Sequence, residues 1–162
     1  MKFRDVTLCY IVKDHKWLML LRNKKANDIN EGKWIGVGGK VEDNETVEEC
    51  IIREIKEETG LNPFKVDFRG VVDFIYEFKD YEKIWVYTCC DFDGEVKECD
   101  EGTLAWINEE DILYLDLWEG DVVFLKKLIE NNDELFHFEL KYDEQGNLVN
   151  SIDKGVYKLW VI

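Results

Sequence analysis

Short apolar runs bounded by polar turns mark the N-terminal part of the chain. Thr7–Val12 and Trp17–Leu21 are two such runs, and the polar segment 13–16 between them predicts a hairpin. Lys33–Val37 predicts a further short strand, which ends at the glycine pair Gly38–Gly39.

The next segment has the period of a helix. Four apolar residues fall on one stripe at about 100° per residue, namely Val47, Cys50, Ile51 and Ile55. Thr46 followed three residues later by Glu49 forms a capping-box pattern, and Gly60 followed by an apolar residue is typical of a helix end. The pattern therefore predicts a helix over Val47–Thr59.

The rest of the chain alternates strand-like and helical patterns without a regular repeat. The predicted elements are strands at Phe68–Phe78, Lys83–Phe92 and Leu104–Ile107, a helix at Asp121–Ile129, and a hairpin of Leu135–Tyr142 with Leu148 onward. This order indicates the α/β or α+β class with a mixed sheet. The chain has no repeat or linker-like tract, so we expect a single domain over residues 1–162.

Acidic residues stand where the predicted helix least favours them. Glu54 and Glu58 lie within its apolar stripe, and Glu57 lies at the edge of that stripe. Carboxylates in a last turn oppose the helix dipole, and neighbours three or four apart repel one another. A solvated acidic helix is one interpretation. The other interpretation is that these acids bind a divalent cation. The preceding glycine pair permits close backbone approach and favours this second interpretation, a metal-phosphate site.

Composition narrows the classes of partner. The formal net charge is −15, which disfavours binding to a nucleic acid polymer. We find no apolar run of signal-peptide or membrane-spanning length, and expect a cytoplasmic protein without membrane contact. The five cysteines are odd in number and lack CxxC spacing, which favours reduced, buried thiols over a zinc site.

The spacing of the acids and glycines resembles the Nudix box. Its defined positions are matched by Gly39, Glu45, Arg53-Glu54-Ile55, Glu57-Glu58 and Gly60-Leu61. The resemblance implies a mixed β-sheet sandwiched between helices and hydrolysis of a nucleoside diphosphate linked to a further group. It also implies Mg²⁺, with Mn²⁺ as a possible substitute, and metal-binding roles for Gly38, Glu54, Glu57 and Glu58. Glu45 and Arg53 match positions that brace the loop against the helix.

Segments outside the box resemble the 8-oxo-dGTP diphosphatase branch of this family, which hydrolyses oxidised purine nucleoside triphosphates. They read GKWIGVGGKVEDNET, CDEGTLAW, LWEGD and FHFELKY. The resemblance implies that Glu101 contacts metal or water, that Trp118 packs on a purine and that Asp121 reads its edge. Trp118 as an ordinary core aromatic is the alternative. In this branch two adjacent acids read the purine edge, but here Gly120 stands where the first acid would be. Glu119 is a candidate to replace it if the loop is shifted by one residue.

Three further residues are candidates for substrate contact. Ile35 stands where mammalian enzymes of this branch carry an asparagine, and it offers only apolar contact. Lys40, beside the glycine pair, is a candidate for phosphate binding. Lys24 is a weaker one, because a solvated position in a polar loop is the simpler explanation for it and for Lys25.

Together these features predict a Mg²⁺-dependent hydrolase of a small-molecule nucleotide that releases a monophosphate and pyrophosphate, with Glu57 or Glu101 as general base. ADP-ribose, a dinucleoside polyphosphate or a capped nucleotide are alternative substrates, and a noncatalytic nucleotide sensor is an alternative function. Monomer and homodimer both remain open, since the C-terminal GVYKLWVI could be a packing segment, an extra strand or a dimer contact.

Overall fold

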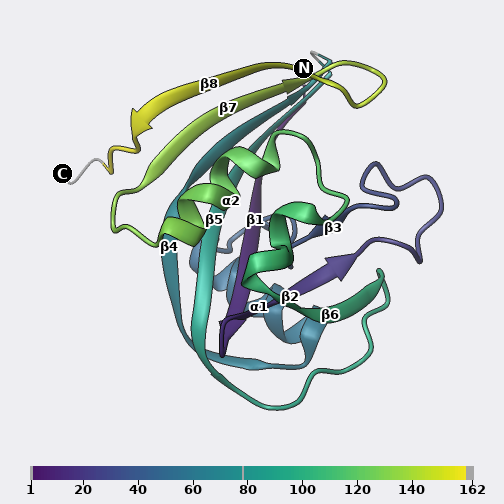
Figure 1. Cartoon of the computed structure of the whole chain (residues 1–162), viewed down its shortest axis with the longest axis vertical. Coiled ribbons are helices and arrows are strands. Elements are labelled where there is room, and N and C mark those ends of the chain that lie inside the picture. Colours follow the sequence, from purple (N-terminus) through teal and green to yellow (C-terminus); the bar gives the residue numbers. More distant parts are fainter. Residues whose placement is uncertain (1, 78, 160–162) are drawn as a thin grey trace.

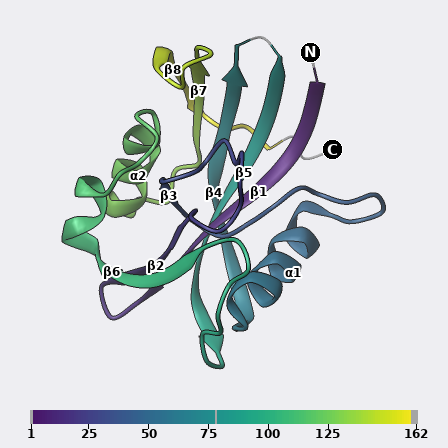
Figure 2. The ribbon, with the colours of Figure 1, turned by 90° about the vertical axis from the view of Figure 1, so that its right-hand side faces the viewer.

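A mixed sheet with helices on both faces forms the protein (Figure 1). The computed structural model describes residues 2–77 and 79–159. The strands are β1 Lys2–Lys13, β2 Lys16–Leu21, β3 Trp34–Ile35, β4 Asn62–Tyr76, β5 Asp80–Asp93, β6 Thr103–Asn108, β7 Phe136–Tyr142 and β8 Leu148–Val156. The helices are α1 Val47–Thr59, α2 Asp121–Glu130 and the 3₁₀ helix η1 Glu109–Tyr114. Figure 2 shows α1 and α2 on opposite sides of the sheet, which confirms the predicted fold class.

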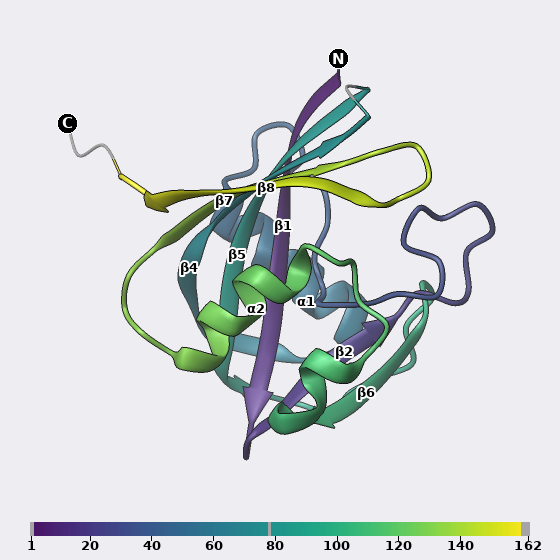
Figure 3. The same cartoon turned by 45° about the horizontal axis from the view of Figure 1, so that its top comes forward.

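The strand order is β3-β2-β1-β5-β4-β7-β8, and β6 also pairs with β2. The pairs β1/β5 and β4/β7 are parallel and the others are antiparallel. The β7–β8 hairpin lies at one edge of the sheet, and the segment between β2 and β3 projects from the body (Figure 3). This mixture of directions agrees with the absence of a regular βαβ pattern in the sequence.

The first hairpin and the first helix confirm the sequence predictions. Asp14 and His15 form the turn between β1 and β2 with φ of 53° and 62°, as a two-residue hairpin turn requires. Helix α1 has the predicted bounds, a reciprocal capping box of Thr46 and Glu49, and a left-handed C-cap at Gly60. Local signals therefore determine both elements.

Other predicted bounds need correction. The expected strand Lys33–Val37 shortens to β3, because residues 36–41 leave β2 and run beside β1. Strand β4 begins at Asn62, and the register shifts after Pro63, whose nitrogen cannot donate to the ladder. Helix η1 was not predicted. Phe78, the expected end of one strand, lies outside the described residues.

Two apolar cores flank the sheet. One lies between the sheet and α2, and the other between the sheet and α1. Four of the five free cysteines are buried and Cys90 is exposed, in agreement with the predicted thiols. At the C-terminus, Gly155 and Val156 end β8, and the Tyr157 ring packs edge-on against Trp85. This part of GVYKLWVI therefore forms strand and packing contacts, and residues 160–162 lie outside the described residues. No helix in the described residues is long and apolar enough to cross a membrane.

Candidate active site

The glycine segment before α1 lies against β1. Antiparallel bridges join Cys9 to Val37 and Val6 to Lys40. Gly38 is therefore opposite Leu8, in the non-hydrogen-bonded position between bonded pairs, where the backbone N–H and C=O point away from the neighbouring strand. A β-carbon on Gly38 would overlap the Thr7 carbonyl, so this close approach requires glycine. The Gly38 carbonyl accepts no backbone hydrogen bond from a described residue, and its role as a metal ligand stays a prediction.

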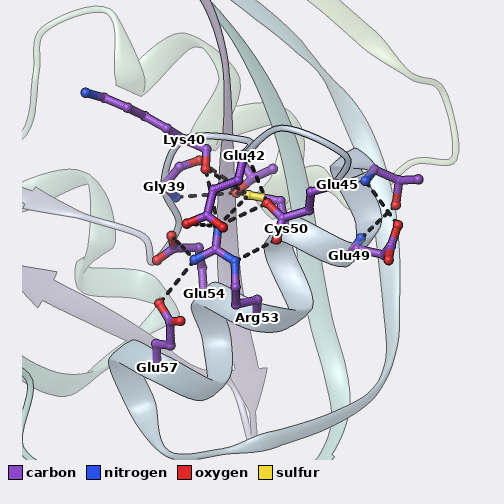
Figure 4. A network of polar contacts seen from close by, with 11 residues as sticks. Gly39, Lys40, Glu42, Glu45, Glu49, Cys50, Arg53, Glu54 and Glu57 are labelled. Atoms are coloured by element: carbon purple, nitrogen blue, oxygen red, sulfur yellow. Dashed lines mark hydrogen bonds and ion pairs between the residues drawn. The ribbon is translucent and has the colours of Figure 1, made fainter.

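An ion pair braces the loop against α1 (Figure 4). Arg53 Nε and Nη2 donate to the two oxygens of Glu45 at 2.6 and 3.0 Å. This bidentate contact lowers the pKa of Glu45 to about 2. Arg53 also donates to Glu54 at 2.9 Å and to the Lys40 carbonyl at 3.3 Å. The predicted bracing pair is therefore formed in this structure.

Three carboxylates line one end of a shared cavity. They come from the inner face of α1 and from the segment before β6, and are Glu54, Glu58 and Glu101. Glu58 is 8% exposed, and its Oε2 is buried without a hydrogen-bond partner among the described residues. Burial, followed by the charge of Glu101, raises the pKa of Glu58 well above its usual range. Burial likewise raises the pKa of Glu54.

Glu57 stands apart from this group. Its side chain is 58% exposed, it does not line the cavity, and its carboxylate accepts from Arg53 Nη1 at 3.1 Å. At 100° per residue, position 57 turns from the sheet toward solvent, whereas Glu54 and Glu58 share one face. The structure therefore does not place Glu57 with the other predicted metal ligands.

The carboxylates are held by cations of the protein. Arg22 Nη1 lies 3.3 Å from Glu101 Oε2, and Lys25 Nζ lies 3.1 Å from Oε1. A second contact of Arg22, from Nε to Asp28 Oδ2, is 2.7 Å long. Among the described residues, no three His, Cys, Asp or Glu side chains already form a metal cluster.

The donor set nevertheless suits a divalent cation. Glu58 presents a buried carboxylate oxygen without a partner, and a buried carboxylate is costly unless it is paired or bound to metal. Oxygen donors from carboxylates and a backbone carbonyl are those that Mg²⁺ prefers. Glu54, Glu58, Glu101 and the Gly38 carbonyl therefore fit such an ion.

The loop between β2 and β3 supplies cavity residues that the sequence analysis missed or misplaced. Lys25, Arg22 and Asp28 line the cavity. Lys24 does not, because its ammonium donates to the Cys99 carbonyl at 2.8 Å, so its predicted substrate contact is not supported. The basic sequence RNKK indicates that this loop could bind phosphate, but only the fold shows which of its two lysines lines the cavity.

The cavity has a volume of about 680 Å³ and continues from the carboxylates to an apolar end. Lys40 lines it beside the glycine segment, and in Figure 4 its ammonium extends away from the Arg53 network. The predicted residues Ile35, Trp118 and Asp121 line its apolar end, with Phe74 and others. One cavity, partly open to solvent, is thus lined by residues from both predicted halves of the site.

Trp118 and Asp121 have different surroundings within that end. Trp118 belongs to the core beside α2 and contacts Phe74 and Tyr142 edge-on, as the core interpretation expects. It also lines the cavity, and its packing on a purine stays a prediction. Asp121 is buried, its side chain has no hydrogen bond to a described residue, and burial raises its pKa to about 7. Glu119 is exposed, accepts from the Leu148 N–H at 3.3 Å and does not line the cavity.

Comparisons with known proteins agree with this geometry. The NUDIX domain family matches residues 2–128. An uncharacterized Nudix hydrolase, YvcI, from Bacillus subtilis is 29% identical and covers 90% of each chain. An oxidized purine nucleoside triphosphate hydrolase from Danio rerio is 26% identical over 84% of this chain and 86% of its own. A crystal structure of a MutT protein from Bacillus halodurans has a TM-score of 0.82 at 24% identity and covers 93% of this chain and 97% of that one.

The family match covers strands β1 to β6, α1 and most of α2, and includes every carboxylate, glycine and arginine of the site. The β7–β8 hairpin lies beyond the match but continues the same sheet through β4. The chain belongs to the Nudix family and is a Nudix hydrolase, a pyrophosphohydrolase.

Proposed function

We propose that this protein hydrolyses a nucleoside triphosphate, preferably an oxidised purine such as 8-oxo-dGTP, to the monophosphate and pyrophosphate, with Mg²⁺ or in its place Mn²⁺. The observation that carries this proposal is one cavity whose lining includes both the carboxylates Glu54, Glu58 and Glu101 and an apolar group around Trp118, beside which Asp121 also lines it. A triphosphate joined to a purine has the same division between a charged and a largely apolar part.

Glu54, Glu58, Glu101 and the Gly38 carbonyl would hold the cation. A bound divalent cation supplies positive charge to the phosphates and lowers the pKa of an attacking water. Of the two predicted bases, Glu101 lines the cavity and Glu57 does not. We therefore assign proton removal from water to Glu101, whose position Arg22 and Lys25 maintain.

The chain's own cations would bind the phosphates. Lys40 and Lys25 line the cavity near the carboxylates, and each ammonium can offset the charge of a phosphate oxygen. The Glu45–Arg53 pair holds the loop and helix at a fixed separation, which keeps the Gly38 carbonyl and Glu54 in place.

At the apolar end, Trp118 and Ile35 would contact the faces of the base and Asp121 would hydrogen-bond its edge. The relatives from Danio rerio and Mus musculus, both named oxidized purine nucleoside triphosphate hydrolases, support this choice of substrate. Two other relatives indicate the competitors to test. They are a CTP pyrophosphohydrolase from Escherichia coli and an ADP-ribose pyrophosphatase from Methanocaldococcus jannaschii, which is 48% identical over 61 residues.

The test is hydrolysis of 8-oxo-dGTP, dGTP, CTP and ADP-ribose with Mg²⁺, with products separated by chromatography. We expect the highest kcat/KM for 8-oxo-dGTP, and a smaller preference over dGTP in Asp121→Ala, because a site that hydrogen-bonds a substrate group rejects the analogue lacking it. A ratio of one or less against dGTP, CTP or ADP-ribose would reassign the substrate. Binding without turnover of any compound would favour the nucleotide sensor instead.

A further inference from the structure

Asn30 is a cavity residue that neither the Nudix box nor the predicted base contacts include. It lies in the projecting segment between β2 and β3 (Figure 3) and lines the cavity together with Ile29 and Ile35. Its Oδ1 accepts a hydrogen bond from Trp118 Nε1 at 2.7 Å. An indole N–H can only donate, so this contact fixes which end of the amide faces the tryptophan.

The amide is therefore oriented before any ligand binds. The amino group Nδ2 points away from Trp118, and it has no hydrogen bond to a described residue. The backbone of Asn30 is held as well, since its N–H donates to Asp28 Oδ1 at 3.1 Å and its carbonyl accepts from Lys33 N at 2.9 Å. Asp28 is in turn fixed by Arg22 at 2.7 Å. Asn30 thus combines a fixed backbone with a free pair of N–H donors.

Two polar groups in the part of the cavity near Trp118 differ in hydrogen-bonding character. Asn30 supplies a donor, and Asp121 supplies a carboxyl without a hydrogen-bond partner among the described residues. Ile35 supplies no polar atom, so the donor must come from elsewhere in the lining. The edge of hypoxanthine or guanine places a carbonyl acceptor at position 6 beside an N–H donor at position 1. Adenine places an amino donor at position 6 beside a ring acceptor, which is the opposite order.

We propose that Asn30 determines base specificity by donating a hydrogen bond from Nδ2 to the 6-oxo group of a purine, and that the protein therefore prefers 6-oxopurine over 6-aminopurine nucleotides. This inference rests on the proposed function, because it places a base beside Trp118. With a 6-aminopurine, two N–H donors would face each other and both would lose a partner. A site of this kind discriminates by one to several powers of ten.

The test compares dITP with dATP, whose bases differ only at the edge in question. At pH 8.5, we expect kcat/KM to be at least about tenfold higher for dITP in the unmodified protein. Asn30→Asp keeps an oxygen for Trp118 Nε1 and replaces the amino donor by an acceptor, so it should lower the dITP/dATP ratio by about tenfold or more. The added charge affects the binding of both triphosphates equally, so its effect cancels in the ratio.

Asn27→Asp is the matched control. It adds the same charge in the same loop at an exposed residue that does not line the cavity, so the ratio should stay at the wild-type value. Trp118→Phe keeps a ring but removes the indole donor, and it should lower the ratio by freeing the Asn30 amide to rotate. An unchanged ratio in Asn30→Asp, or an equal fall in Asn27→Asp, would overturn the inference.

Binding of the monophosphates separates this inference from the proposed function. Calorimetric titration of the protein with dIMP and with dAMP needs no turnover. If no triphosphate is hydrolysed, the proposed function fails, while tighter binding of dIMP that Asn30→Asp removes would still support the role of Asn30. If triphosphates are hydrolysed but dIMP and dAMP bind equally, the proposed function stands and the inference about Asn30 is wrong.

Discussion

The carboxylate of Glu54 occupies the space beside Gly39 in which a side chain at position 39 would begin. A β-carbon there would overlap Glu54 Oε1, whereas one on the preceding Gly38 would overlap the Thr7 backbone carbonyl. The two glycines are therefore needed for different reasons. Gly39 makes room for a side chain of the active site, and Gly38 makes room for a neighbouring strand.

Alanine at these two positions should separate activity from stability. In Gly39→Ala the atom that must move is the end of a flexible side chain, so we expect kcat to fall about tenfold or more with little change in the thermal midpoint. In Gly38→Ala the overlap is with backbone, which cannot move aside, and the thermal midpoint should fall by several degrees. Wild-type kcat in Gly39→Ala would contradict the placement of Glu54 as a ligand.

Replacement of Glu58 by glutamine should abolish most activity without unfolding the protein. A neutral amide of nearly the same shape is a poorer Mg²⁺ ligand, so we expect kcat to fall by a factor of about 100 or more. The metal-free variant should be about as stable as the wild type, since burial raises the pKa of Glu58 and the amide has nearly the shape of the protonated acid. Glu48→Gln is the control, because Glu48 is exposed in the first turn of α1, and it should keep wild-type kcat.

Magnesium should stabilise the native state. Binding to the folded form alone raises the free energy of unfolding by about 1.4 kcal/mol when free Mg²⁺ is ten times Kd, which corresponds to roughly 3 to 5 °C in thermal midpoint. The comparison is thermal unfolding in EDTA and in millimolar Mg²⁺. The shift should be smaller in Glu58→Gln. Equal midpoints in both solutions for the wild type would count against a metal site at these carboxylates.

Asp121 should make the stability of the metal-free protein fall as pH rises. Its pKa in the folded protein is about 7 because of burial, above the usual value near 3.9 in an unfolded chain. The folded state therefore binds more protons between these values, and its advantage at low pH is lost as pH rises through 7.

Urea unfolding in EDTA at pH 5 and pH 7 measures this effect. Between pH 5 and pH 7, the free energy of unfolding of the wild type should fall by roughly 1 to 2 kcal/mol more than that of Asp121→Asn. Taking the difference between the two proteins removes the contribution of other acids, including Glu58. The same loss in both proteins would show that Asp121 titrates with an ordinary pKa.

The sequence alone determined helix α1 and its acidic face. The Thr46–Glu49 box and Gly60 fix the ends of α1, and the 3.6-residue period places Glu54 and Glu58 on the buried stripe. These are local effects, which act between residues a few positions apart. They were sufficient to predict the bounds of α1 and the inward acids, whereas the roles of Glu45 and Arg53 and the class of chemistry came from the resemblance to the Nudix box.

Tertiary structure decided which residues share the cavity. Lys24 and Lys25 are indistinguishable in a polar loop, yet only Lys25 lines the cavity with Glu101. Glu57 belongs to the sequence motif, but its side chain points away from the cavity and accepts a hydrogen bond from Arg53. The bond between Asn30 and Trp118 joins residues 88 positions apart. Such contacts depend on strand pairing and packing between distant segments, which produce no periodic pattern in the sequence from which they could be predicted.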